Sequence, residues 1–321
     1  MRASPFYGLL LLLASGSMTA AGTAEFGPDA ARPLEFSQVH MGMPVRLVLH
    51  AASPDAARLA AGAAFERIAA LDRMMSDYRD DSELRRLDAR PLEWIPVSEE
   101  LFAVLTRAVE IAEATGGAFD PTVAPLVALW RDARTSGRLP ERSRLEAARA
   151  LVGWRDIHFD SSRRAIRLGR AGMRLDLGGI AKGYILQEAL RTLRAHGVAS
   201  ALLEAGGDIV VGDAPPGRPG WRIDTPSADP AFTDRAAKLC NAVLATSGPT
   251  SQFVELDGVR YSHVVDPRTG LGVTNHVVAR VIAQDGATAD ALATALTVVG
   301  PKGADAIVRR FPDVRIDLRR E

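Results

Sequence analysis

The segment Leu175-Asp-Leu-Gly-Gly-Ile-Ala-Lys-Gly-Tyr184 joins an expected strand to an expected helix. The strand is expected to end at Asp176. Gly178 and Gly179 then allow the backbone to approach a ligand closely, and the N–H groups at a helix start attract anions. Lys182 adds a positive charge in the first helical turn. The segment matches neither a P-loop nor a dinucleotide fingerprint. It therefore predicts a phosphate-binding turn, and a purely structural Gly-Gly turn is the alternative.

The rest of the chain alternates between helical and strand-like patterns, which predicts a mixed α/β (α+β) fold. Helices are expected at Pro54–Met75 after the N-cap Ser53, at Ser98–Thr115, and from Ile180 to His196. Residues 213–230 are rich in Pro, Gly and Asp, which predicts a surface excursion. Strands are expected at Met43–His50, Ala165–Leu168, Met173–Leu177, Val198–Leu203, Val243–Thr246, Tyr261–Val265 and Val277–Ile282. We expect one domain over residues 25–321.

Composition excludes several classes of function. The 321 residues carry 39 basic and 39 acidic side chains, so the chain has no net positive charge that would attract nucleic acid. Only 6% of the residues are aromatic, which argues against a stacking platform for single strands. The single cysteine, Cys240, excludes an internal disulfide framework and a multi-cysteine metal site. We expect no nucleic-acid partner.

Residues 1–24 are typical of a secretory signal peptide. Arg2 precedes an apolar run, Phe6–Ala14, and small residues continue to Ala24. The apolar run is too short to span a bilayer, although an uncleaved anchor is the alternative. No cysteine directly follows this run, so we expect no lipid attachment point there. We expect a periplasmic protein without a stable membrane anchor.

Asp290 and Thr294 are four residues apart in an Ala- and Leu-rich segment that is expected to be helical. This spacing places both side chains on one face, one turn apart. A carboxylate and a hydroxyl are hard oxygen ligands of the kind that Mg²⁺ accepts. The alternative is that Asp290 complements the helix dipole and Thr294 bonds back to a carbonyl.

His263 precedes a turn formed by Asp266-Pro-Arg268-Thr-Gly270. The arginine could hold a phosphate through two hydrogen bonds, and the histidine could accept a proton. A structural histidine on a strand is the alternative. Asp208, after a Gly-Gly pair, either orients one of these groups or closes a turn.

Taken in order, these clusters resemble the FAD:protein flavin mononucleotide transferase family, also called the thiamine biosynthesis lipoprotein ApbE family. The resemblance covers nearly the whole chain after residue 40. The motifs that carry it are Met41-Gly42, Met75-Ser-Asp-Tyr78 with Asp81-Ser-Glu83, Gly117-Ala-Phe-Asp120-Pro-Thr, Asp176–Gly183, Gly206-Gly-Asp208, Thr246-Ser-Gly248, His263–Gly270 and Asp290–Thr294.

The resemblance implies a single ApbE-like domain with mixed or antiparallel sheets flanked by helices. It implies an enzyme that takes FAD as substrate, requires Mg²⁺, attaches FMN to a Thr or Ser hydroxyl of a target flavoprotein and releases AMP. Such targets carry a short acceptor motif and serve in redox complexes. Two alternatives remain: a Mg²⁺-dependent FAD pyrophosphatase that uses water, and a non-catalytic periplasmic flavin carrier.

The resemblance also assigns roles to individual residues. The metal ligands would be the carbonyl of Ala181 with Asp290 and Thr294. His263 would be the general base with Asp266 second, and Lys182 or Arg268 would neutralise charge on the leaving group. The flavin pocket would comprise Met41, Tyr78, Ala118, Phe119, Asp120, Asp176, Gly178, Lys182, His263 and Val265.

Two positions depart from the pattern of the family. Glu204 stands where Asn is usual ahead of Gly-Gly-Asp, and Pro249-Thr250 replace an acidic or Asn residue and Tyr after Thr-Ser-Gly. Both departures would reshape the adenine side or the target-peptide side of the cleft and leave the metal ligands intact.

Overall fold

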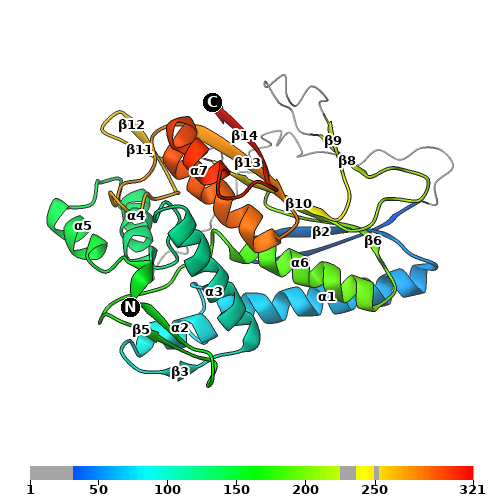
Figure 1. Cartoon of the computed structure of the whole chain (residues 1–321), viewed down its shortest axis with the longest axis horizontal. Coiled ribbons are helices and arrows are strands. Elements are labelled where there is room, and N and C mark those ends of the chain that lie inside the picture. The colour runs from blue at the N-terminus through cyan, green and yellow to red at the C-terminus, as the bar shows by residue number, and fades with distance from the viewer. Residues whose placement is uncertain (1–31, 225–235, 249–252, 321) are drawn as a thin grey trace, which may run out of the picture.

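A seven-stranded antiparallel sheet forms the centre of the molecule (Figure 1). The computed structural model describes residues 32–224, 236–248 and 253–320. The predicted signal peptide, residues 1–24, and Pro249-Thr250 lie outside these residues. In spatial order the strands are β1 (Leu34–His40), β2 (Met43–His50), β6 (Ser200–Ala205), β7 (Asp208–Val211), β10 (Ala242–Ser247), β13 (Val277–Ala283) and β14 (Arg315–Arg320).

Three long helices, α1 (Pro54–Met75), α6 (Ala181–Ala195) and α7 (Gly286–Val308), cover one face of this sheet (Figure 1). They enclose the main hydrophobic core together with apolar side chains of β2, β6, β10 and β13. Among the described residues, α7 has the length and apolar composition to cross a membrane. It packs against β10 and β13, so its composition is that of a core helix.

The other face of the sheet is covered by the hairpin of β8 (Trp221–Asp224) and β9 (Ala236–Leu239). Trp221, Ile223 and Leu239 of this hairpin pack on apolar residues of β2, β6, β7, β10 and β13. The remaining elements gather beside the sheet (Figure 1). They are α2 (Glu83–Ala89), β3 (Ile95–Pro96), α3 (Glu99–Ala114), α4 (Ala124–Ser136), α5 (Arg142–Arg149), η1 (Trp154–Asp156), β4 (Ile157–Asp160), β5 (Ala165–Leu168), β11 (Phe253–Leu256) and β12 (Val259–Ser262).

The predicted mixed α+β class and the three predicted helices are confirmed. Ser53 caps α1 by accepting the Ala56 N–H at 3.2 Å, as its position before Pro54 predicts. The alternation in β2 is also confirmed, because Val45, Leu47 and Leu49 are fully buried. These elements follow from local signals that need no distant partner.

Three strand or loop predictions are wrong. Met173–Leu177 lies in none of the described sheets, because its N–H groups bond to other elements: Leu175 to the Asp88 carboxylate and Asp176 to the Pro121 carbonyl. The expected strand Tyr261–Val265 ends at Ser262, and Val265 makes one bridge, to Gly272. The expected excursion at 213–230 includes β8, because Trp221 and Ile223 are buried against the sheet.

Two glycines bring the starts of α6 and α7 into backbone contact. A Cβ at Gly183 would overlap the Gly286 carbonyl, and a Cβ at Gly286 would overlap the Gly183 carbonyl. We expect Gly183→Ala to lower the free energy of unfolding by about 1–3 kcal/mol or more, because backbone atoms cannot move aside as a flexible side chain can. Urea denaturation measures the change. Gly62→Ala in α1 is the matched control, since nothing lies within 4 Å of its Cβ; equal losses in both variants would refute the steric explanation.

Candidate active site

Lys182 is the centre of a buried charge cluster that joins α6, β7 and α7. Its Nζ lies 2.5 Å from Asp208 Oδ2 and 2.9 Å from Asp290 Oδ1. The second oxygen of Asp290 accepts the Gly183 N–H at 3.2 Å, and Asp208 Oδ1 accepts the Thr246 N–H at 2.9 Å. Asp208 therefore positions Lys182; that it orients a group of the His263–Arg268 segment stays a prediction.

The cluster carries one positive and two negative groups. Burial alone would lower the pKa of Lys182, but Asp208 and Asp290 outweigh it and raise the pKa, so the ammonium stays charged. Burial raises the pKa of Asp208 to about 6, against the lowering effect of Lys182. With both carboxylates ionised the net charge is negative. A negative net charge favours a cation nearby; the direct contact of Lys182 with a phosphate stays a prediction.

The three predicted metal ligands lie near the start of α6. Asp290 is 3% exposed and bonds to Gly183, while a Cβ at Gly179 would lie 2.9 Å from the Thr294 hydroxyl oxygen. Ala181 lies between these two glycines. A carbonyl, a carboxylate and a hydroxyl are hard oxygen donors, and this donor set fits Mg²⁺. The described residues contain no cluster of three or more His, Cys, Asp or Glu that could hold a metal.

The predicted flavin-pocket residues of the 117–122 segment face inward. Ala118 and Phe119 are 1% and 4% exposed, and Phe119 lies against the backbone of Gly179. Asp120 accepts hydrogen bonds from the Thr122 N–H and hydroxyl and from the Trp154 N–H. Burial raises the pKa of Asp120, and these hydrogen bonds counteract it. The segment is therefore fixed by hydrogen bonds within it and to Trp154. Its contact with a flavin stays a prediction.

The Gly-Gly turn is held from outside by Asp88 of α2, which sequence reasoning missed. The Asp88 carboxylate accepts the Leu175 N–H at 2.9 Å and a hydrogen bond from Arg85 at 3.0 Å. Within the turn, Asp176 Oδ1 accepts the Gly178 N–H at 2.7 Å. Burial is the main cause that raises the pKa of Asp176. One N–H of the predicted phosphate-binding turn is thus already bonded inside the turn.

Asp88 makes stability depend on pH. Burial raises its pKa to about 6, well above the ordinary value of an aspartate, so the folded state holds this proton more tightly than the unfolded chain does. The resulting stabilisation is present below pH 4 and is lost as the pH rises to 6. Relative to Asp88→Asn, we expect the wild-type free energy of unfolding to fall by up to about 3 kcal/mol across this window. Urea titrations of both proteins measure the difference; a pH-independent difference would contradict it.

His263 lies on a separate segment, exposed in the bend after β12. In the turn that follows it, Arg268 binds Asp266 through two side-chain hydrogen bonds of 2.9 Å, one to each carboxylate oxygen. This hydrogen bonding raises the pKa of Arg268. Because Asp266 and Arg268 neutralise each other, the geometry favours His263 over Asp266 as the base. The three catalytic assignments stay predictions.

The other predicted pocket residues are dispersed around the centre. Met41 has a left-handed backbone, φ 52°, in the β1–β2 turn, and its N–H donates to Asp72 of α1. Tyr78 is 79% exposed, and Val265 is buried against α4. α4 itself was missed as a helix, and it organises much of this region: Trp130 Nε1 donates to the Gly270 carbonyl at 2.8 Å, which fixes the turn after His263.

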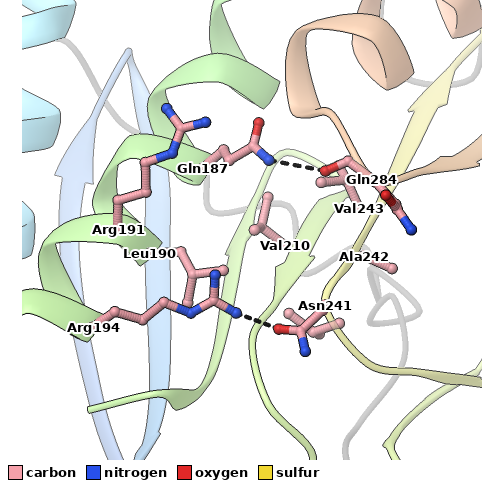
Figure 2. A pocket seen from close by; sticks show the side chains of 10 residues that line it. Gln187, Leu190, Arg191, Arg194, Val210, Asn241, Ala242, Val243 and Gln284 are labelled. Carbon is pink, nitrogen blue, oxygen red and sulfur yellow. Dashed lines mark hydrogen bonds between the residues drawn. The ribbon is translucent and has the colours of Figure 1, made fainter. Parts of the chain in front are cut away.

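Farther along α6, a pocket lies between this helix, β7, β10 and the turn before α7 (Figure 2). Gln187 closes one side of it: its side chain donates to the Gln284 carbonyl and accepts the Gly286 N–H, both at 2.9 Å. Arg194 donates to Asn241 on the other side (Figure 2). The Gln187 contacts tie the start of α7 to α6, and this fixes Asp290 relative to Lys182.

The model of the ApbE family matches residues 41–316. The chain belongs to the ApbE family. It is 35% identical over 260 residues to an FAD:protein FMN transferase of Treponema pallidum, with 75% of this chain and 71% of that protein covered. An Escherichia coli FAD:protein FMN transferase is 31% identical over 251 residues, covering 74% and 70%.

Solved structures of ApbE proteins show the same fold. An ApbE protein of Thermotoga maritima has a TM-score of 0.79 at 31% identity, covering 90% of this chain and 97% of that one. The flavinyl transferase ApbE of Pseudomonas stutzeri, in its apo form, has a TM-score of 0.78 at 27% identity, covering 91% and 92%. The ApbE-like fold expected from the sequence is therefore confirmed.

Glu204, where the resemblance leads one to expect Asn, has a clear partner in the structure. Its carboxylate binds Arg46 of β2 at 2.7 Å across the β2–β6 ladder. Arg46 also lies 3.5 Å from Glu35 of β1. Glu204 alternates with Leu203 and Ala205, whose side chains lie in the main core beneath the helices. Its side chain therefore lies on the face of the sheet away from those helices.

Proposed function

We propose that this chain transfers FMN from FAD to a Ser or Thr hydroxyl of a target flavoprotein and releases AMP. The hydroxyl oxygen would attack the phosphorus of the FMN half. The bond from that phosphorus to the AMP oxygen would break, AMP would leave with the electron pair, and the hydroxyl proton would pass to a base. The observation that carries the proposal is the Lys182–Asp208–Asp290 cluster, set in the ApbE fold of a chain whose relatives are named FAD:protein FMN transferase.

Asp290 of the cluster would hold Mg²⁺ together with the Thr294 hydroxyl and the carbonyl of Ala181. When bound, Mg²⁺ supplies positive charge that offsets the charge developing on the phosphate oxygens. Lys182 would fix the orientation of the Asp290 carboxylate, and Asp208 would hold Lys182. The negative net charge of the cluster supports a cation there.

His263 would accept the proton of the acceptor hydroxyl, whose own pKa lies far above neutrality. Its exposure suits a residue that must meet the side chain of another protein. An FAD pyrophosphatase would use the same groups with water as nucleophile, and a flavin carrier would bind FAD without turnover. The buried, preorganised Asp290 favours an enzyme over a carrier, since a carrier needs no charged centre of this kind.

We also propose that residues 1–24 direct export and are removed, which would place the enzyme in the periplasm beside redox complexes. The basis is the pattern of Arg2, the short apolar run and the small residues up to Ala24. Cell fractionation followed by N-terminal mass analysis tests this. A cytoplasmic protein that keeps Met1 would refute it.

Intact-mass spectrometry tests the proposed reaction. The chain from residue 25 is incubated with FAD, Mg²⁺ and a test protein that carries an Asp-Gly-x-Ser/Thr-Gly-Ala-Ser/Thr-like acceptor motif. We expect the acceptor to gain the mass of FMN less one water, with AMP released in equal amount. Release of FMN and AMP without a labelled acceptor would favour the pyrophosphatase. FAD bound without turnover would favour the carrier.

A further inference from the structure

Arg131 of α4 contacts two segments that are far apart in the sequence. Its Nη1 lies 2.7 Å from Asp77 Oδ2, and its Nη2 lies 3.7 Å from Asp176 Oδ2. Its guanidinium carbon lies 4.4 Å from the centre of the Tyr78 ring. One side chain therefore joins the segment after α1 to the Gly-Gly turn before α6. The sequence reasoning gave no role to this arginine.

Tyr78 is unusual because it is 79% exposed and yet held in place. The Arg131 guanidinium lies over one face of the ring, and the Tyr78 N–H donates to the Ser76 hydroxyl at 3.2 Å. A cation over a ring face restrains the ring by electrostatic attraction. The opposite face can then receive a planar group without a further loss of side-chain entropy.

Asp77 and Asp176 would repel an anionic ligand if Arg131 were absent. Their side chains are only 14% and 11% exposed, and Asp176 adjoins the Gly178-Gly179 turn. Both carboxylates have Arg131 as an ion-pair partner. A planar guanidinium can satisfy two carboxylates and a ring at once, which a lysine ammonium cannot do equally well.

We propose that Arg131 is a positioning residue for the flavin nucleotide: it fixes the Tyr78 ring and neutralises Asp77 and Asp176 beside the Gly-Gly turn. The inference rests on the proposed function, because that function makes FAD the ligand. Arg131 acts before any chemical step, through two other groups. Its loss is therefore expected to weaken FAD binding much more than it slows turnover at saturating FAD.

A double-mutant cycle with FAD as the probe tests this. Arg131→Gln is expected to raise the FAD Kd about tenfold and to change kcat less than twofold, as measured by fluorescence titration and steady-state assays. Arg131→Lys keeps the charge but not the planar geometry, so we expect an intermediate Kd. In a Tyr78→Ala background, Arg131→Gln is expected to raise the FAD Kd by at most about threefold more. The restraint of the Tyr78 ring, one of the two contributions of Arg131, has already been lost in that background.

Arg142→Gln is the matched control, since this arginine of α5 is 92% exposed and forms a local i,i+4 ion pair with Glu146. It should leave the FAD Kd unchanged. One outcome is that the wild type binds and turns over FAD while the Kd increases of Arg131→Gln and Tyr78→Ala multiply in full in the double variant. In that case the positioning role is wrong and the proposed function stands. An equal Kd for Arg131→Gln and wild type overturns the inference as well. If the wild type binds no FAD, the proposed function fails first, and the inference fails with it.

Discussion

Asp290→Asn is expected to abolish FMN transfer without unfolding the protein. The variant removes the only carboxylate among the proposed Mg²⁺ ligands. A bound metal stabilises the charge that develops in the transition state by several kcal/mol. Its loss should therefore slow transfer by about 10³-fold or more. The fold should survive, because the charge cluster changes from two carboxylates and one ammonium to a balanced Lys182–Asp208 pair. Breaking a buried pair destabilises when it leaves a charge uncompensated, and here no charge is left over.

Two measurements separate loss of metal from loss of structure. Without Mg²⁺, we expect Asp290→Asn to melt no lower than the wild type. With Mg²⁺ at about 100 times its Kd, the wild type should gain about 2.7 kcal/mol of unfolding free energy, and the variant should gain nearly none. Calorimetry with and without the metal measures both effects.

Asp208→Asn is the matched control, because it also removes one carboxylate from Lys182 and leaves a balanced pair, Lys182–Asp290. It should keep the response to Mg²⁺ and lose less activity. If Asp208→Asn and Asp290→Asn lose transfer equally and both still gain stability from Mg²⁺, then Asp290 acts through Lys182 and is no metal ligand.

The helices and strands were predictable where their signal in the sequence is local. α1, α3 and α6 carry an apolar stripe and clear ends, such as Ser53 before Pro54, and β2 places Val45, Leu47 and Leu49 on one face. The order of the Gly-rich motifs was enough to indicate the ApbE family. Because helix position sets side-chain direction, the sequence also placed Asp290 and Thr294 on one face of one helix.

The supporting contacts of the site could not be predicted, because they join segments far apart in the chain. Residues 173–177 are strand-like, yet their N–H groups bond to Asp88 and Pro121, and no local pattern indicates either partner. In the same way, Arg131 follows an ordinary helical pattern, and only the fold brings Asp77 and Asp176 to it. The sequence assigned Lys182 to a phosphate; the structure places two carboxylates around it first.

His263→Gln is the second variant for which we expect a large effect. A general base contributes about 10²–10⁴-fold to rate, so transfer should slow by this factor. FAD binding should persist, because the side chain is exposed and is only one of ten residues of the predicted flavin pocket. Rapid-quench assays at saturating FAD, together with fluorescence titration of FAD, measure rate and affinity separately. His196→Gln, at the end of α6, is a control for loss of an exposed imidazole.

The comparison of His263→Ala with Asp266→Asn decides which group takes the proton. Added imidazole should restore part of the rate of His263→Ala, because the small base can occupy the vacated space and accept the proton itself. Asp266→Asn should have the smaller effect, since its carboxylate is already bound by Arg268 at both oxygens. If instead Asp266→Asn is the slower variant and imidazole restores nothing to His263→Ala, then Asp266 is the base. The Arg268 pair would then have to open whenever an acceptor hydroxyl binds.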